Sequence, residues 1–163
     1  MNSPYCGKFR VTQTQHSNHD GLDLVGIDSK EIHATVSGVV HFAGWENPAN
    51  PSQGFGRFVC IKCEGLFYYY GHLSQINVKT GDNVKITDVI GIEGSTGKST
   101  GSHCHYCVRP EFKAGKSMNV SIISGIPNAC GDYDDGYRPG NKIKKRIEIF
   151  IDGQRKYSGL LDD

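Results

Sequence analysis

No stretch of ten residues in this chain repeats its apolar side chains with the period of an α-helix. Short runs rich in β-branched and aromatic residues occur instead, separated by Gly, Pro, Asn and Asp. We therefore expect a mainly β fold with little helix, in which antiparallel strands form a curved sheet or barrel-like sandwich with a groove on one face. The runs expected to form strands are 8–16, 32–36, 39–43, 57–63, 66–70, 89–93 and 103–109, and the stretch 19–25 is expected to enter another short strand.

Two short segments predict how neighbouring runs are connected. Glu64-Gly65 lies between two β-rich runs and is a hairpin signal. Ser37-Gly38 separates the runs 32–36 and 39–43, which we expect to form a hairpin or a bent strand pair.

The length of 163 residues suits one domain with a proper core. We assign residues 1–125 to that domain and 126–163 to a C-terminal extension. The segment 142–161 predicts a β-hairpin around Asp152-Gly153. This hairpin fits a linker, the start of a further binding element, or a strand that extends the main sheet.

Charge and hydropathy exclude two classes of partner. The net charge is +1 and no basic block is present, so nucleic-acid binding is not expected. No apolar run approaches the roughly 20 residues of a membrane-spanning helix, so we expect no membrane insertion. We expect the protein to be a monomer.

His103 and His105 stand two residues apart in the run 103–109. Residues i and i+2 of a strand point to the same face, roughly 7 Å apart, so the two imidazoles should lie side by side. Cys104 should then point the opposite way. Imidazole binds metals and carries protons near neutral pH. The motif alone fits a hydrogen-bonded pair on a half-buried strand equally well.

His19-x-Gly21-x-Asp23 offers a nitrogen and an oxygen ligand four residues apart. Gly21 allows the backbone to bend so that both side chains converge. Zinc accepts imidazole and carboxylate, and a catalytic zinc site uses three protein ligands and leaves one position for water. Taken alone, His19 also fits a turn residue and Asp23 a capping residue.

These two motifs stand in an ordered series with others. In chain order, the series comprises His19-x-Gly21-x-Asp23, the segment 32–40, Tyr70-Gly71-His72-Leu73-Ser74, the segment 78–84, and Gly94-Ser95-Thr96-Gly97-x-Ser99-Thr100-Gly101-x-His103-x-His105. It resembles the series found in the lysostaphin/LytM-type zinc metallopeptidases, and the resemblance covers about residues 8 to 110.

The resemblance implies a role for five side chains. His19, Asp23 and His105 correspond to the ligands of one zinc ion, and His72 and His103 to catalytic residues that do not bind the metal. One of these two histidines would take a proton from the attacking water, and the other would stabilise the oxyanion. The resemblance does not distinguish which histidine has which role.

The resemblance also implies the substrate, a short peptide of a peptidoglycan stem or cross-bridge. The protein would then be an endopeptidase that acts on the bacterial cell wall. Met1–Arg10 lacks the basic-then-apolar pattern of a signal peptide. We therefore expect a phage lysin, a module of a phage tail or mobile element, or a domain of a larger secreted hydrolase.

The chain departs from the family at the second histidine motif. The usual Leu-His-Phe-Glu is replaced by Cys104-His105-Tyr106-Cys107. Strand alternation places Cys107 on the face of His105, where an acidic residue is usual, and we expect a structural thiol there. We expect all six cysteines to be free. The pairs Cys60-x-x-Cys63 and Cys104-x-x-Cys107 suggest a second zinc site, but cysteines three apart in a strand converge poorly.

Two other interpretations compete with the peptidase. A non-catalytic relative that binds peptidoglycan or a protein is expected to have lost ligands, whereas all five site positions are present here. A sugar-phosphotransferase carrier with paired histidines would need no His-x-Gly-x-Asp element and no stoichiometric zinc.

Overall fold

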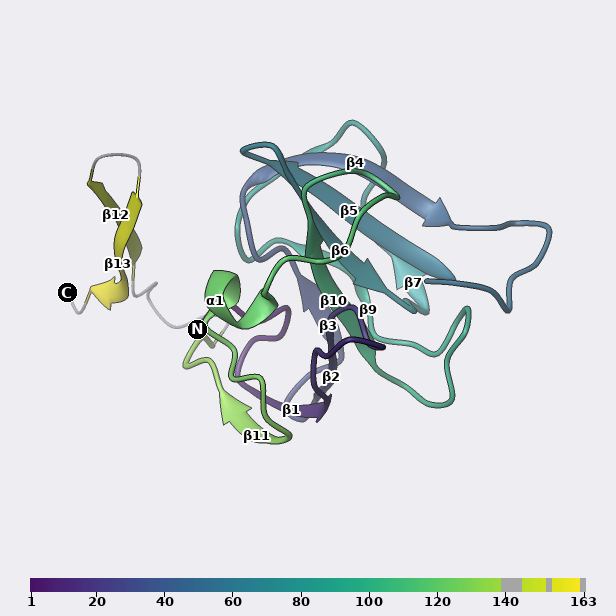
Figure 1. Ribbon diagram of the computed structural model, residues 1–163, viewed down its shortest axis with the longest axis horizontal. Coiled ribbons are helices and arrows are strands. Elements are labelled where there is room, and N and C mark those ends of the chain that lie inside the picture. Colours follow the sequence, from purple (N-terminus) through teal and green to yellow (C-terminus); the bar gives the residue numbers. More distant parts are fainter. Residues whose placement is uncertain (139–144, 152–153, 162–163) are drawn as a thin grey trace.

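The computed structural model describes residues 1–138, 145–151 and 154–161. Strands dominate this part of the chain, and its one helix spans five residues (Figure 1). That helix is too short to cross a membrane. The elements in chain order are β1 (Lys8–Gln13), β2 (Leu22–Gly26), β3 (Glu31–His33), β4 (Gly38–Trp45), β5 (Arg57–Cys63), β6 (Leu66–Gly71), β7 (Gln75–Ile76), β8 (Asn83–Val84), β9 (Val89–Ile92), β10 (Cys104–Arg109), α1 (Val120–Ser124), β11 (Gly131–Asp134), β12 (Lys145–Ile151) and β13 (Gln154–Leu161).

Eight strands form the main sheet in the order β11-β1-β2-β10-β6-β5-β4-β8. All neighbouring pairs in this sheet are antiparallel. A smaller antiparallel sheet has the order β3-β9-β7. These sheets confirm the prediction of a mainly β, antiparallel fold with little helix. The central pairing of β2 with β10 brings together two segments that are far apart in the sequence.

The two faces of β10 have different surroundings. Cys104, Tyr106 and Val108 point into the main hydrophobic core. Cys107 points to the opposite face and belongs to a second buried cluster that includes Phe58 and Tyr69. This alternation agrees with the strand parity expected from the sequence. It leaves the face that carries His105 and Cys107 for the functional site.

The connection between β5 and β6 confirms the predicted hairpin at Glu64-Gly65. The φ angles of these two residues are 49° and 80°, and the flanking Cys63 and Leu66 are paired. Positive φ at both central residues is the geometry of a type I′ turn, whose twist matches that of the flanking strands. Glycine adopts this conformation at no steric cost.

Of the two arrangements expected across Ser37-Gly38, a hairpin or a bent strand pair, the hairpin does not form. β3, which precedes this turn, pairs with β9 in the small sheet, whereas β4, which follows it, pairs with β5 and β8 in the main sheet. The turn therefore connects two sheets. Short-range turn chemistry indicated a change of direction here, but the strand partners are set by contacts that are distant in the sequence.

The C-terminal part contributes to two sheets. β11 pairs with β1 at the edge of the main sheet, and Figure 1 shows this green strand beside the purple β1. β12 and β13 pair with each other as the predicted hairpin, although its turn, 152–153, lies outside the described residues. Since β11 lies beyond residue 125, the domain division at 125/126 stays a prediction.

Candidate metal centre

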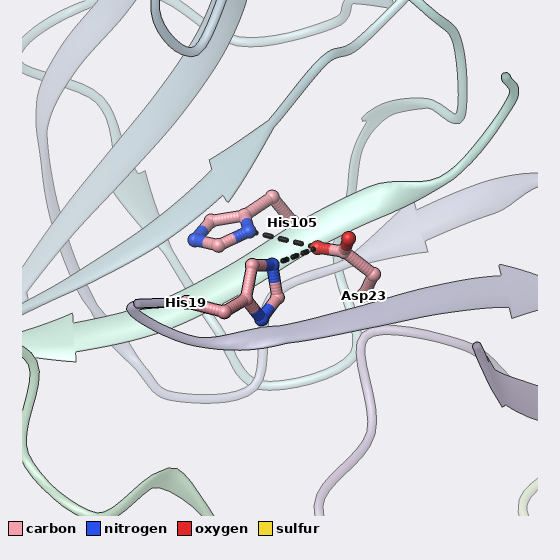
Figure 2. A group of neighbouring side chains, drawn as sticks. All are labelled: His19, Asp23 and His105. Atoms are coloured by element: carbon pink, nitrogen blue, oxygen red, sulfur yellow. Dashed lines mark hydrogen bonds and ion pairs between the residues drawn. The ribbon is translucent and has the colours of Figure 1, made fainter. Parts of the chain in front are cut away.

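The two motifs expected to bind metal meet where β2 pairs with β10. Asp23 on β2 lies directly opposite His105 on β10. His19 precedes β2 in a turn that is closed by two backbone hydrogen bonds with His16, each 3.0 Å long. Figure 2 shows the His19 and His105 rings converging on the Asp23 carboxylate.

The three side chains are close enough to share one metal ion. His19 Nε2 lies 3.1 Å from Asp23 Oδ1, and His105 Nδ1 lies 2.8 Å from the same oxygen. One potential ligand atom from each residue lies within 4.8 Å of the others. Two imidazole nitrogens and a carboxylate oxygen are a donor set that suits zinc. In the described part of the chain, no other group of three His, Cys, Asp or Glu side chains converges in this way.

Gly21 makes this convergence possible. Its φ is +152°, and a Cβ at this position would lie 2.7 Å from His105 Nε2 and 2.7 Å from the Tyr106 carbonyl oxygen. Any side chain here would push the loop that carries His19 away from β10. The predicted role of Gly21 in bringing His19 and Asp23 together therefore has a steric basis.

Backbone carbonyls orient both histidine ligands. His19 Nδ1 lies 3.0 Å from the Thr14 carbonyl oxygen, and His105 Nε2 lies 3.0 Å from that of Asp20. A carbonyl oxygen only accepts hydrogen bonds, so each of these nitrogens must carry a proton. In a neutral ring the other nitrogen, Nε2 of His19 and Nδ1 of His105, is then left with a lone pair that points toward the metal position.

The electrostatics of the metal-free cluster favour binding of a cation. Burial alone would lower the pKa of His105, but hydrogen bonds and electrostatic interactions with Asp23 and Cys107 together outweigh burial and raise it to about 10. Burial opposes ionisation of Asp23, yet its histidine neighbours lower its pKa below the usual value. The carboxylate is thus charged at neutral pH and holds a proton on the facing imidazole, where a metal ion can replace that proton.

His72 occupies an unusual backbone position immediately after β6. Its φ is 63°, in the left-handed region that few residues other than glycine adopt. Its ring nitrogen Nδ1 lies 2.7 Å from the Thr96 carbonyl oxygen. Burial lowers the pKa of His72 to about 4, so the ring is neutral at pH 7. Such a conformation at a cleft side chain is typical of a functional position.

His103 completes a group of five side chains. Its Nδ1 lies 2.8 Å from the Gly101 carbonyl oxygen, and its Nε2 lies 3.6 Å from Asp23 Oδ2. The centroids of the His72 and His103 rings are 4.6 Å apart. The structure thus brings together all five residues singled out in the sequence.

The five side chains line one cleft of about 850 Å³. Residues of two loops, 46–56 and 94–102, form much of the remaining lining. The cleft residues from these loops include Glu46, Phe55, Lys98 and Ser99. The expected groove on one face of the sheet is therefore present at the candidate metal centre.

The two rim loops touch through glycines. A Cβ on Gly56 would lie 2.4 Å from the Gly97 nitrogen, and one on Gly97 would lie 2.3 Å from the Gly56 nitrogen. The Lys98 N–H also donates to the Gly54 carbonyl over 2.9 Å. These backbone contacts hold the two loops against each other beside the cleft.

Within the described residues, no cysteine belongs to the candidate ligand group, although Cys107 forms a hydrogen bond with the His105 ring. All six are free thiols, and Cys107 is fully buried among aromatic side chains below the site. Its position on the face of His105 agrees with the sequence prediction, and the Cys60/Cys63 and Cys104/Cys107 pairs do not gather into a second metal cluster within the described residues.

Sequence reasoning missed Asp20 and Arg109, which join the loop of His19 to β10. Arg109 Nη2 lies 2.7 Å from Asp20 Oδ2. The sequence signal was present, since Asp20 stands inside the His-x-Gly-x-Asp motif and Arg109 lies four residues after His105. Only the fold reveals that the two residues form a pair.

This sheet and this cluster define a β protein with a candidate His/Asp/His metal site in a cleft. The chain belongs to peptidase family M23, whose family model matches residues 17–120.

Individual relatives agree with this membership. The chain is 37% identical over 123 residues to the DD-carboxypeptidase/endopeptidase Mpg of Neisseria meningitidis, covering 75% of this chain and 27% of that protein. It is 37% identical over 90 residues to the glycyl-glycine endopeptidase ALE-1 of Staphylococcus capitis, covering 55% of this chain and 24% of the relative. The chain thus spans about a quarter of the length of these relatives.

A solved structure shows the same fold. The catalytic domain of the prophage-encoded M23 protein EnpA from Enterococcus faecalis superposes with a TM-score of 0.61 at 31% sequence identity. The superposition covers 72% of this chain and 94% of that domain. The resemblance to metallopeptidases of the lysostaphin type, inferred from the motifs, is thereby confirmed at the level of family and fold.

Proposed function

We propose that this protein is a zinc-dependent endopeptidase that hydrolyses peptide bonds in peptidoglycan stems or cross-bridges. The observation that carries the proposal is the convergence of His19, Asp23 and His105 within 4.8 Å, at a cleft that two further histidines also line. A relative named for cutting between glycines and one named DD-carboxypeptidase/endopeptidase support this substrate class.

One zinc ion held by His19, Asp23 and His105 fits this donor set. Three protein ligands leave a position open, as a catalytic zinc site requires. When bound there, zinc supplies Lewis-acid polarisation of the scissile carbonyl and lowers the pKa of the attacking water. The protein contributes the fixed ring orientations, because the carbonyls of Thr14 and Asp20 hold the histidine protons on the side away from the metal.

His72 and His103 carry out proton transfer and oxyanion stabilisation. Each ring donates from Nδ1 to a backbone carbonyl, so Nε2 is the nitrogen left for the substrate. One Nε2 accepts the proton of the attacking water, and the other, once protonated, donates a hydrogen bond to the oxyanion of the tetrahedral intermediate. Their close packing allows both to reach one scissile bond.

The cleft suits an extended peptide. Its floor is the β-sheet that carries Asp23 and His105, and its rim contains both a carboxylate, Glu46, and an amine, Lys98. We propose that the protein acts as a monomer on the bacterial cell wall, outside the cell or delivered by a phage.

Hydrolysis of purified cell walls tests the proposal directly. Walls with different cross-bridge chemistry are digested, and the released peptides are identified by mass spectrometry, which also fixes the bond that is cut. We expect products from the parent protein and from His41→Ala, an exposed histidine outside the cleft, but none from His105→Ala. Metal analysis should find one zinc per chain.

Two outcomes would contradict this function. Equal binding of the parent and His105→Ala to walls, with no released peptide from either, would favour a non-catalytic wall-binding relative. A folded parent protein that takes up no stoichiometric zinc would refute the metal-dependent mechanism.

Replacing Gly97 with alanine should force the rim loops apart. Its φ is +76°, and the new Cβ would meet the Gly56 nitrogen at 2.3 Å and the Gly54 carbonyl oxygen at 2.5 Å. A displacement of about 1 Å in a positioning loop can cost up to about 100-fold in rate, and we expect wall hydrolysis to fall toward that extent. Gly81→Ala is the control, because Gly81 also has positive φ but has open space around its Cβ position. Equal rates for both variants would argue against a role for the loop contact.

A further inference from the structure

Asp20 stands between the first metal-ligand candidate, His19, and Gly21, yet its side chain points away from the metal position. We propose that Asp20 is a positioning residue that fixes the imidazole of His105 through its own backbone carbonyl. The proposal rests on the proposed zinc site and concerns how the protein holds that site in shape.

The backbone and the side chain of Asp20 have separate partners. The carbonyl oxygen lies 3.0 Å from His105 Nε2. Oδ2 accepts a hydrogen bond of 2.7 Å from Arg109 Nη2, and Oδ1 accepts one of 2.6 Å from the Ser117 N–H. The side chain thus anchors the peptide group that orients the ring.

Both anchors of the carboxylate are themselves tied to β10, the strand of His105. Arg109 is the last residue of β10, and its guanidinium lies over the rings of Phe55 and Tyr69 at 5.5 and 5.4 Å from their centroids. Ser117 is bound to Val108 of the same strand by two hydrogen bonds through its hydroxyl group. These contacts form a closed network. The Asp20 side chain binds Arg109 and Ser117, both of these residues are held by β10, and His105 on β10 contacts the Asp20 carbonyl.

This network restrains a part of the backbone that includes Gly21. Gly21, the next residue, must lack a side chain to approach β10, and glycine gains more freedom than other residues when a constraint is lost. Without the Asp20 carboxylate, the Asp20 carbonyl would lose the two side-chain anchors that hold it at hydrogen-bond distance from His105 Nε2. The ring could then rotate or change tautomer and remove its Nδ1 lone pair from the metal position.

A carboxylate suits these two anchors better than an amide. The guanidinium and the backbone N–H both donate, and a carboxylate offers an acceptor oxygen to each. An asparagine keeps the size of the side chain but provides one acceptor oxygen only, so its NH₂ group would face a donor. Asp20→Asn should therefore disturb this network less than Asp20→Ala does, but measurably more than the parent side chain.

The affinity for zinc is the decisive measurement. We expect Asp20→Ala to weaken zinc binding by about 10- to 100-fold, the usual effect of removing a group that orients a ligand histidine, and Asp20→Asn to fall between it and the parent. Competition with a chelator of known affinity at pH 7 gives these values. The matched control is Asp132→Ala, which also breaks an ion pair with an arginine, Arg10, but on the edge strand β11; its zinc affinity should equal that of the parent.

A spectroscopic readout separates positioning from general stability. In the zinc-loaded parent, ¹H–¹⁵N correlation spectra of the imidazoles should show His105 protonated at Nε2 as a single tautomer, and in Asp20→Ala this proton should exchange faster or disappear. Circular dichroism identifies which of the two Asp20 variants is folded, and an unchanged affinity in a folded variant overturns the proposal. Equal weakening in Asp132→Ala overturns it too. Failure of the parent itself to bind zinc would instead refute the proposed function.

Discussion

Replacing Asp23 with alanine should abolish zinc binding and wall hydrolysis together. One oxygen of this carboxylate contacts both His19 and His105, and the other lies 3.6 Å from His103 Nε2. Loss of a group that only orients a ligand costs about 10- to 100-fold in metal affinity, so removal of a central anionic ligand should exceed about 100-fold. Chelator competition and product analysis by mass spectrometry measure the two effects.

Asp23→Asn gives the matched comparison. It keeps a carbonyl oxygen at the same place but removes the charge, so zinc affinity should be intermediate and activity strongly reduced. Wall hydrolysis by Asp23→Ala at the rate of the parent, with the protein free of metal, would exclude the assigned ligand set. If Asp23→Ala retained both activity and bound zinc, other residues would have to hold the ion.

Replacing Glu93 with alanine should strongly destabilise the folded protein, although Glu93 is not one of the five candidate site residues. The Glu93 side chain is fully buried and accepts hydrogen bonds from Tyr5, Gly26, Lys30 and Ser102, with lengths between 2.5 and 2.9 Å. Leaving buried donors without an acceptor costs roughly 1–3 kcal/mol for each, although Lys30 can return to water. We expect the free energy of unfolding to fall by about 3 kcal/mol in urea titrations of the metal-free protein.

The same carboxylate should contribute to acid sensitivity. Burial alone would raise the pKa of Glu93, but the hydrogen bonds that it accepts, first that from Ser102, lower it below the usual value. A depressed folded-state pKa means that this stabilisation is fully present above the ordinary glutamate pKa of about 4.3 and is lost as the pH falls through the folded-state value. The difference in stability between parent and Glu93→Ala should therefore shrink in acid.

Glu111→Ala is the control for the Glu93 prediction, because Glu111 is exposed and carries the same charge. It should change the unfolding free energy by less than about 0.5 kcal/mol. A Glu93→Ala variant as stable as this control would show that water or rearranged side chains satisfy the four donors.

Much of the fold was predictable because it depends on local chemistry. Alternation along the run 103–109 predicted His103 and His105 on one side and Cys104 on the other, and Glu64-Gly65 specified its own turn. The five site residues were predictable for a different reason: their motifs occur in a fixed order that resembles a family.

The features that escaped sequence reasoning depend on partners far away in the chain. β3 and β4 join different sheets, which no local turn signal encodes. Asp20 acquires its role from Arg109 and Ser117, about 90 positions later, and the left-handed backbone at His72 is held by tertiary contacts. The carbonyls that orient the ligand histidines are backbone groups, which every residue type provides.

The alternation along β10 limits how this protein can change. Core residues and site residues follow one another along a single strand, so shortening or lengthening β10 by one position would exchange the two sets. His105 would turn into the apolar interior, and Tyr106 would turn toward the cleft. Single replacements can thus adjust the cleft while the interior stays intact, whereas a one-codon deletion would damage both at once.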